Sequence, residues 1–162
     1  MKGHAPSLLD KLLQPDTSGK EGLSLRHSVE QVKDSVARDI EMLLNSHASF
    51  QPEDLAGTPN AARSLLTLGL IDISSMSLAS VHDRRRIVEA IRTSLMNHDK
   101  RLTQVEVGVR DAQGPSAKLT FSIRAKLILR PQSEPVIFDA VLQPGSKRYE
   151  VSKAENRNMP TP

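Results

Sequence analysis

The sequence predicts an α+β domain of two layers, in which N-terminal helices pack on one face of a mainly antiparallel sheet of four strands. Three observations lead to this prediction. Hydrophobic residues recur at helical spacing up to residue 95, and from residue 105 they alternate with polar residues. The alternating segments are separated by short turns that contain proline and glycine. Helices followed by a run of hairpin strands are typical of the α+β class.

The helical part begins with a long helix at Ser28–Asn45, where Ser28 is the expected N-cap and Gln31 completes a capping box. A shorter helix is predicted at Ala61–Leu68 and is closed by Gly69. A third helix starts at Ser80, with Asp83 at the capping-box position. The expected core faces of the long helices contain Val29, Val32, Val36, Ile40, Leu43, Leu44, Ile87, Val88, Ile91 and Leu95. The acidic residues Glu30, Asp34, Asp39 and Glu41 are expected to lie mostly on a solvated helix face.

The sheet is predicted from four alternating segments. Their expected places are Gln104–Arg110, Leu119–Leu129, Val136–Leu142 and Arg148–Val151, with turns at Gln113–Pro115, Pro131–Pro135 and Pro144–Gly145. The second segment has one apolar and one mostly polar face, as in a sheet that is covered on one side only. A strand with a polar outer face can also serve as an edge that accepts a partner's strand.

The chain divides into three expected parts. Residues 1–26 form an N-terminal segment with a short amphipathic helix and a linker, residues 27–152 the main domain, and residues 153–162 a disordered tail. In the first part, Ser7 and Asp10 suggest a capping box, and Leu8, Leu9, Leu12 and Leu13 form an apolar face. Two interpretations of this segment stay open: it folds back on the domain, or it docks on a partner.

Composition excludes several classes of function. Aromatic residues make up 2% of the chain, too few for base-stacking nucleic-acid platforms. The chain has no cysteine, and no apolar run approaches the roughly 20 residues of a membrane span. We therefore expect a cytoplasmic protein without membrane insertion. The net charge of +3 is spread along the chain except at Arg84–Arg86, which leaves a nucleic-acid module as a minor alternative.

No enzymatic or metal-binding motif emerges from the sequence. Phosphate-binding glycine loops, H-E-x-x-H and G-x-S-x-G are absent. The five histidines are scattered and not at metal-ligand spacing; they are His4, His27, His47, His82 and His98. No catalytic residue, metal or cofactor is therefore predicted.

The most informative stretch is the joint between the third helix and the first strand, formed by Asp99, Lys100 and Arg101. Two interpretations stand side by side. The three charged residues form a solvated turn with a local ion pair between Asp99 and Arg101, worth at most about 1 kcal/mol if exposed. Alternatively, they dock a partner, because a guanidinium can bind a partner's carboxylate through two hydrogen bonds. Protein binding by these three residues is the preferred hypothesis.

The chain resembles the TssE family, the baseplate wedge component of bacterial type VI secretion systems, over about residues 7 to 151. The resemblance is carried by the order of several motifs: S-L-L-D-K-L-L from Ser7, V-A-R-D-I-E-M-L-L-N from Val36, R-S-L-L-T-L-G-L-I-D-I-S from Arg63, the joint, F-D-A-V-L from Phe138 and G-S-K-R-Y-E-V from Gly145. The family's joint typically reads Glu-Pro-Arg, so that Asp99 stands for the Glu, Lys100 for the Pro and Arg101 for the Arg. Leu68 and Ile71 also depart from the family pattern, which has an aromatic residue and a proline there.

The resemblance implies a non-enzymatic scaffold protein of the cytoplasm. Its partners would be TssF and TssG in the wedge, the TssB/TssC sheath, whose assembly it would help to start, and indirectly TssK. The family also carries a lysozyme-like label, which would imply a muramidase that degrades peptidoglycan. This alternative stays open, although no residues of the chain speak for it.

Overall fold

A computed structural model describes residues 28–50, 52–73, 76–111, 118–129, 132–143 and 145–154. The predicted N-terminal segment, and all of the predicted tail beyond residue 154, lie outside the described residues. The two helices and four strands are α2 (Val29–Leu44), α3 (Val81–His98), β1 (Leu102–Asp111), β2 (Leu119–Leu129), β3 (Gln132–Leu142) and β4 (Tyr149–Lys153). Short 3₁₀ helices are η1 (Pro52–Leu55), η2 (Ala61–Arg63) and η3 (Leu65–Thr67).

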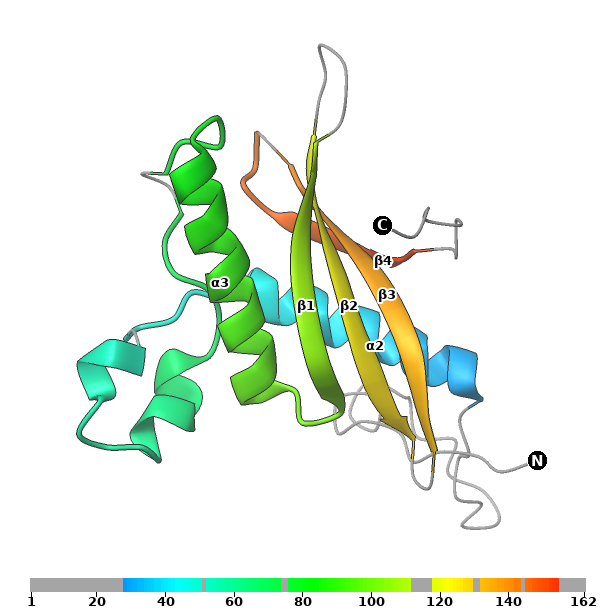
Figure 1. Cartoon of the computed structure of the whole chain (residues 1–162). Coiled ribbons are helices and arrows are strands. Elements are labelled where there is room, and N and C mark those ends of the chain that lie inside the picture. Colours follow the sequence, from blue (N-terminus) through cyan, green and yellow to red (C-terminus); the bar gives the residue numbers. More distant parts are fainter. Residues whose placement is uncertain are drawn as a thin grey trace, which may run out of the picture.

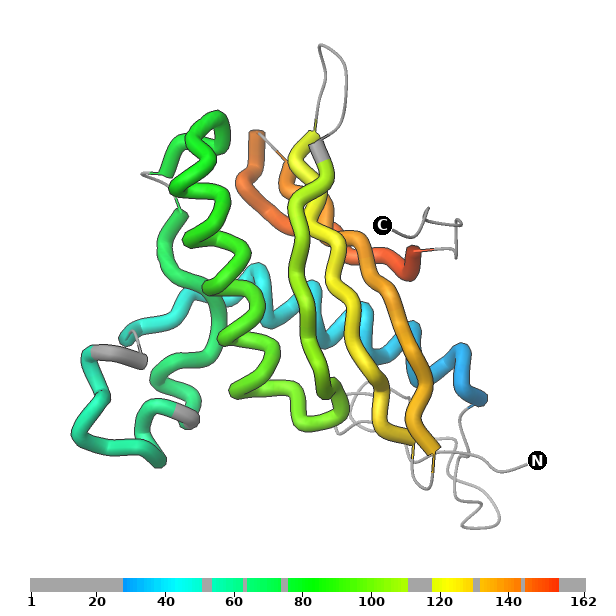
Figure 2. The backbone as a smooth tube through the Cα atoms, in the orientation of Figure 1, coloured from blue at the N-terminus to red at the C-terminus, as the bar shows by residue number. Residues whose placement is uncertain are grey.

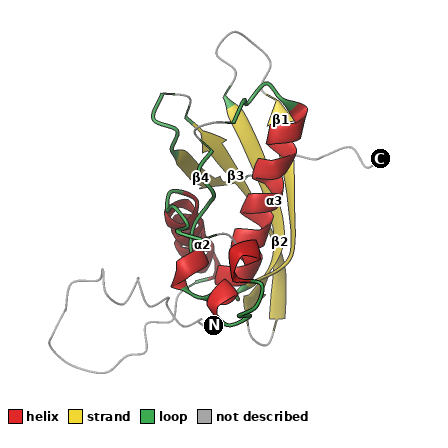
Figure 3. Ribbon diagram, turned by 90° about the vertical axis from the view of Figure 1, so that its left-hand side faces the viewer, coloured by secondary structure: helices red, strands yellow, loops and turns green. Residues whose placement is uncertain are grey.

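The predicted fold class is confirmed. The strands form one antiparallel sheet in the order β1-β2-β3-β4. Helix α3 contacts β1, and α2 contacts β4 and β3. In Figure 1, α3 lies beside β1 and α2 passes behind the strands. Figure 3 shows the same two layers after a quarter turn.

The two long helices begin as their sequences predict. The Ser28 side chain accepts a hydrogen bond from the Gln31 backbone N–H, and the Gln31 side chain accepts one from the Ser28 N–H. At the start of α3, the Ser80 hydroxyl accepts from the Asp83 N–H. These contacts satisfy backbone donors that have no partner inside a helix.

The predicted α-helix at Ala61–Leu68 is wrong. The structure has η2 and η3 instead, separated by Ser64. The Ser64 hydroxyl donates to the carbonyl oxygen of Ala61 and accepts from the Leu66 N–H, so it offers the backbone an alternative to helical pairing. Gly69 does adopt the expected left-handed conformation, with a φ of 115°. A Cβ there would lie 2.3 Å from the Ser46 carbonyl oxygen, so close approach of two segments also requires glycine.

The sheet is longer than predicted at three places. Strand β4 runs to Lys153, which pairs with Phe138, so the predicted start of the tail at residue 153 is wrong. Strand β1 begins at Leu102, and a bulge lies between Thr103 and Glu106, where Gln104 has a φ of 52°. The predicted turn at Pro131–Pro135 is wrong, because β3 already pairs with β2 from Gln132.

Pro135 is tolerated inside β3 because its missing N–H breaks no pair. The Ile137 carbonyl oxygen accepts from the Ala154 N–H, so residue 137, and by alternation Pro135, turn their backbone away from β2. Strand β4 reaches only Phe138–Leu142 on that side. At Pro135 the strand is therefore an edge, where proline is permitted.

The core lies between the sheet and the two helices. The side chains of Phe121, Ile123, Leu127 and Phe138 are fully buried on the sheet side, and those of Val36, Ile87, Ile91 and Leu95 on the helix side. Burial of such side chains is the main favourable term in folding. None of the described helices is both long enough and apolar enough to cross a lipid bilayer.

Candidate functional site

The joint between α3 and β1 is a tight turn at one end of the molecule, which Figure 2 shows as the direct passage from helix to strand. Helix α3 ends where the Asp99 N–H donates to the Leu95 carbonyl oxygen at 2.9 Å. The Leu102 N–H then donates back to the Asp99 carbonyl oxygen at 3.2 Å. Asp99 itself is 8% exposed, so the joint is anchored in the body of the domain.

The Asp99 carboxylate organises the joint through three contacts with Arg101. Its Oδ1 accepts from the Arg101 backbone N–H at 3.0 Å and from Nε at 2.9 Å, and its Oδ2 accepts from Nη2 at 2.8 Å. The first contact is an Asx turn, in which an aspartate side chain accepts from the backbone two residues on. The other two form a fork that aligns a guanidinium with a carboxylate.

A third charged residue, Asp39 of α2, joins this pair. Arg101 Nη2 donates to Asp39 Oδ2 at 2.7 Å. The contact links α2 to the joint across 62 positions of sequence. The helix pattern predicts a solvated Asp39, but its side chain is half-buried and lies next to the buried Ile40. The sequence carries no local signal for this contact, because the partner lies 62 positions away.

The electrostatics of this cluster keep Arg101 charged. Burial alone would lower the pKa of the Arg101 guanidinium, since it disfavours the charged form. The hydrogen bonds and charges of Asp99, followed by those of Asp39, outweigh this effect and raise the pKa above its ordinary value. Arg101 therefore stays protonated between the two carboxylates.

The structure pairs Asp99 with Arg101, whereas Lys100 takes no part in this ion pair. Lys100 is exposed, and no described residue pairs with it. It lies at an open groove of about 540 Å³ between α2 and the joint, which we call the joint groove. The groove wall is mostly apolar, with Ile40, Met42, Leu43, Leu68 and Leu95 lining it.

The two edges of the sheet differ in accessibility. At β4, the Tyr149 N–H donates to Asn45 Oδ1 and the Tyr149 carbonyl oxygen accepts from Asn45 Nδ2, at 2.9 and 2.8 Å. The Val151 N–H donates to Glu41 Oε2 at 2.9 Å. The side chains of Glu41 in α2 and of its C-cap residue Asn45 thus occupy this edge, as a neighbouring strand would. The sequence pattern does not predict that Asn45 and Glu41 bind the backbone of β4; it places Glu41 on a solvated face and Asn45 at the end of the helix.

The β1 edge is open near its end. Residue 128 faces β1, because the Ile128 N–H donates to the Arg101 carbonyl oxygen, and by alternation Ser122 and Thr120 face β1 too. Their partners in β1 are Gly108 and Arg110. The backbone groups of Val107 and Val109 therefore turn away from the sheet. Val109 is 36% exposed, and none of the described segments pairs with this stretch.

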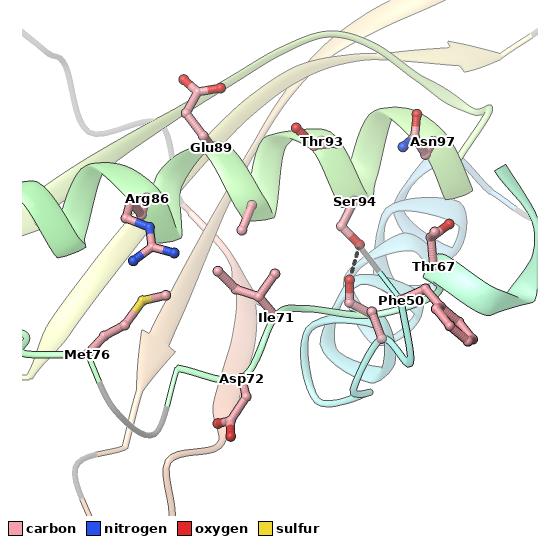
Figure 4. A pocket seen from close by; sticks show the side chains of 13 residues that line it. Phe50, Thr67, Ile71, Asp72, Met76, Arg86, Glu89, Thr93, Ser94 and Asn97 are labelled. Atoms are coloured by element: carbon pink, nitrogen blue, oxygen red, sulfur yellow. Dashed lines mark hydrogen bonds between the residues drawn. The ribbon is translucent and has the colours of Figure 1, made fainter. Parts of the chain in front are cut away.

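A second cavity, of about 580 Å³, lies between α3 and a wall that includes Thr67, Gly69, Ile71, Asp72 and Met76. Figure 4 shows Arg86 and Met76 at one end and Phe50 at the other. Two residues that line this cavity are joined by a hydrogen bond, in which Ser94 Oγ donates to the Gly69 carbonyl oxygen at 2.8 Å. Within the described ranges, no group of three His, Asp or Glu side chains could hold a metal ion.

Comparison with known proteins gives one family. The family model described as baseplate wedge protein gp25 matches residues 30–132, which is more than half of the chain. The match runs from the start of α2 to the first residue of β3 and includes Asp39, the joint and the β1 edge. No curated protein matches the chain. The family gives no support to the muramidase alternative. The chain therefore belongs to the baseplate wedge protein gp25 family, and its role is a structural one in a baseplate.

Proposed function

We propose that this protein is a non-enzymatic wedge subunit of a type VI secretion baseplate in the cytoplasm. It binds the TssF and TssG subunits through the joint formed by Asp99, Lys100 and Arg101, and it reaches TssK only through them. It needs no cofactor, binds no nucleic acid and does not insert into a membrane. The observation that carries the proposal is the rigid ion pair network at the joint, inside the part of the chain that the family model matches.

The three residues of the joint have different roles in this proposal. Asp99 and Arg101 are held in one geometry, so little side-chain entropy remains to be lost on binding. Lys100 is held between them with its charge exposed. An exposed cation on a rigid turn suits a carboxylate of the partner, and such rim charges steer association.

A co-purification experiment tests this docking. Tagged TssF and TssG are mixed with the wild type, Arg101→Ala and Lys100→Ala, and with Lys126→Ala as control, an exposed lysine on the outer face of β2. We expect Lys126→Ala to bind like the wild type and both joint variants to bind less. Full recovery of folded Lys100→Ala and Arg101→Ala would overturn the docking role.

The second part of the proposal is that the chain helps to start the TssB/TssC sheath by strand addition at β1. An unpaired edge accepts an extended segment through backbone hydrogen bonds. The support is the contrast between the edges: Asn45 and Glu41 occupy β4, whereas Val107 and Val109 leave β1 open.

Substitution at the open edge tests the sheath role. Val109→Pro removes an outward N–H without removing a pair inside the sheet, and Val109→Thr keeps that donor. We expect fewer sheaths per cell with Val109→Pro and a normal number with Val109→Thr. Equal numbers for both variants would exclude strand addition at this place.

The non-enzymatic part of the proposal is tested on purified peptidoglycan. The family is a structural one, and the buried carboxylate of the site, Asp99, is engaged by Arg101. We expect no release of soluble fragments. Lysis by the purified protein would contradict this part.

A further inference from the structure

The joint groove has apolar surface that is accessible to a partner segment. Met42 is 49% exposed there and Leu68 is half-buried, whereas Ile40, Leu43 and Leu95 form the buried floor beneath them. A volume of about 540 Å³ is in the range of sites that bury several apolar groups. Removing apolar area from water is favourable, so a segment that covers this wall is stabilised there.

The chain itself contains a segment of the required chemistry. Leu8 and Leu12, and Leu9 and Leu13, stand four positions apart in the sequence that begins with Ser7. On a helix these pairs share one face, which is how an amphipathic helix enters an apolar groove. Asp10 and Lys11 would fall on the opposite, solvated face.

The connection to the domain has the right length. Residues 14–27 separate Leu13 from the N-cap of α2. A flexible chain of this length has an r.m.s. span of roughly 20 Å, at 5–6 Å times the square root of the residue number. The groove lies along α2 at Met42, thirteen residues after Val29, which is about 20 Å at 1.5 Å per residue.

We propose that the joint groove binds the chain's own segment Ser7–Gln14, which docks as a short helix with its four leucines against Met42 and Leu68. The matching span gives the tethered segment an effective concentration on the order of millimolar. A free partner helix at micromolar concentration must compete with it. This occupant goes beyond the proposed baseplate docking and does not depend on it.

The native methionines provide the first test. Methyl-labelled methionine spectra of the full chain are compared with those of a variant in which Leu8, Leu9, Leu12 and Leu13 are replaced by serine. We expect the Met42 methyl signal to shift, and those of Met76 and Met96, which lie outside the groove, to stay. A matched control, Asp10→Asn with Lys11→Gln, leaves Met42 unchanged. An unshifted Met42 in the serine variant overturns the proposal.

Cross-linking then identifies whose segment is bound. The chain has no cysteine, so Leu12→Cys with Met42→Cys introduces a single pair. At low micromolar concentration we expect an intramolecular disulfide, formed at least about tenfold faster than with Leu12→Cys and Lys126→Cys on the outer sheet face. Equal rates overturn the proposal. A disulfide found mainly in dimers assigns the groove to a second copy and also overturns it. Both experiments use the isolated protein, so their failure is distinct from a failure of TssF and TssG binding.

Discussion

One oxygen of Asp99 accepts two hydrogen bonds from Arg101, one from its backbone N–H at 3.0 Å and one from Nε at 2.9 Å. The first fixes the backbone of the joint and the second fixes the guanidinium. In the related Glu-Pro-Arg pattern a proline would restrict the same turn. Here the Asx turn restricts it, which explains how a lysine can stand between the two charged residues.

Removing the carboxylate should therefore destabilise the domain. Asp99→Ala takes away the acceptor of three N–H groups and leaves a half-buried Arg101 with Asp39 alone. We expect a loss of about 2 kcal/mol in the free energy of unfolding, measured with urea. Asp99→Asn, which keeps one acceptor oxygen, should lose less. An unfolding midpoint of Asp99→Ala equal to that of the wild type would contradict this account.

The link between α2 and the joint is weaker than the Asx turn. Asp39→Ala removes a single contact of 2.7 Å to Arg101, and we expect a loss of about 1 kcal/mol in unfolding experiments. Glu89→Ala is the matched control, because its contact with Arg92 is 3.6 Å long and exposed, and should cost nothing measurable. Equal effects of the two substitutions would mean that Asp39 does not bridge the elements.

Gly69 should be intolerant of any side chain. Gly69→Ala combines a φ of 115° with a Cβ 2.3 Å from the Ser46 carbonyl oxygen. We expect a loss of at least about 2 kcal/mol in the free energy of unfolding. Gly57→Ala serves as control, since a Cβ there meets nothing within 4 Å. A thermal midpoint of Gly69→Ala within a degree of the control would show that the two segments can separate.

Alkaline pH should lower the stability of the fold through ionisation of Tyr149 in the unfolded chain. Burial raises the pKa of its phenol, which is 3% exposed and whose oxygen has no partner among the described residues. The unfolded chain ionises near pH 10, whereas the folded chain resists ionisation, so stability falls as the pH rises above about 10. Tyr149→Phe removes this dependence and leaves stability at pH 7 equal or slightly higher. Urea unfolding between pH 7 and 11 measures both effects; an identical decline in Tyr149→Phe would refute the assignment.

Local patterns predicted most of the fold because they act over short distances. The capping boxes at Ser28 and Ser80 and the alternation in β2 each depend on neighbours within a few residues. The predictions failed where tertiary contacts decided. Ser64 breaks the helical pattern with its own hydroxyl, and Pro135 sits in a strand because β4 ends before reaching it.

The candidate site was predictable only in part for the same reason. The charges of Asp99 and Arg101 stand two positions apart in sequence, so their pairing could be expected. Asp39 and Glu41 act across 62 and 110 positions, on Arg101 and Val151, and no local pattern distinguishes them from solvated carboxylates. Their roles follow from the packing of α2 against the sheet.

The affinity of the joint for its baseplate partners tests the central claim most directly. Lys100→Glu reverses an exposed charge without touching the Asp99–Arg101 pair, so the fold should remain intact. We predict that its dissociation constant for a TssF–TssG complex, measured by titration calorimetry, rises at least about tenfold, or 1.4 kcal/mol. Lys126→Glu on the outer face of the sheet should bind like the wild type. Equal affinity of Lys100→Glu and the wild type would contradict docking at the joint.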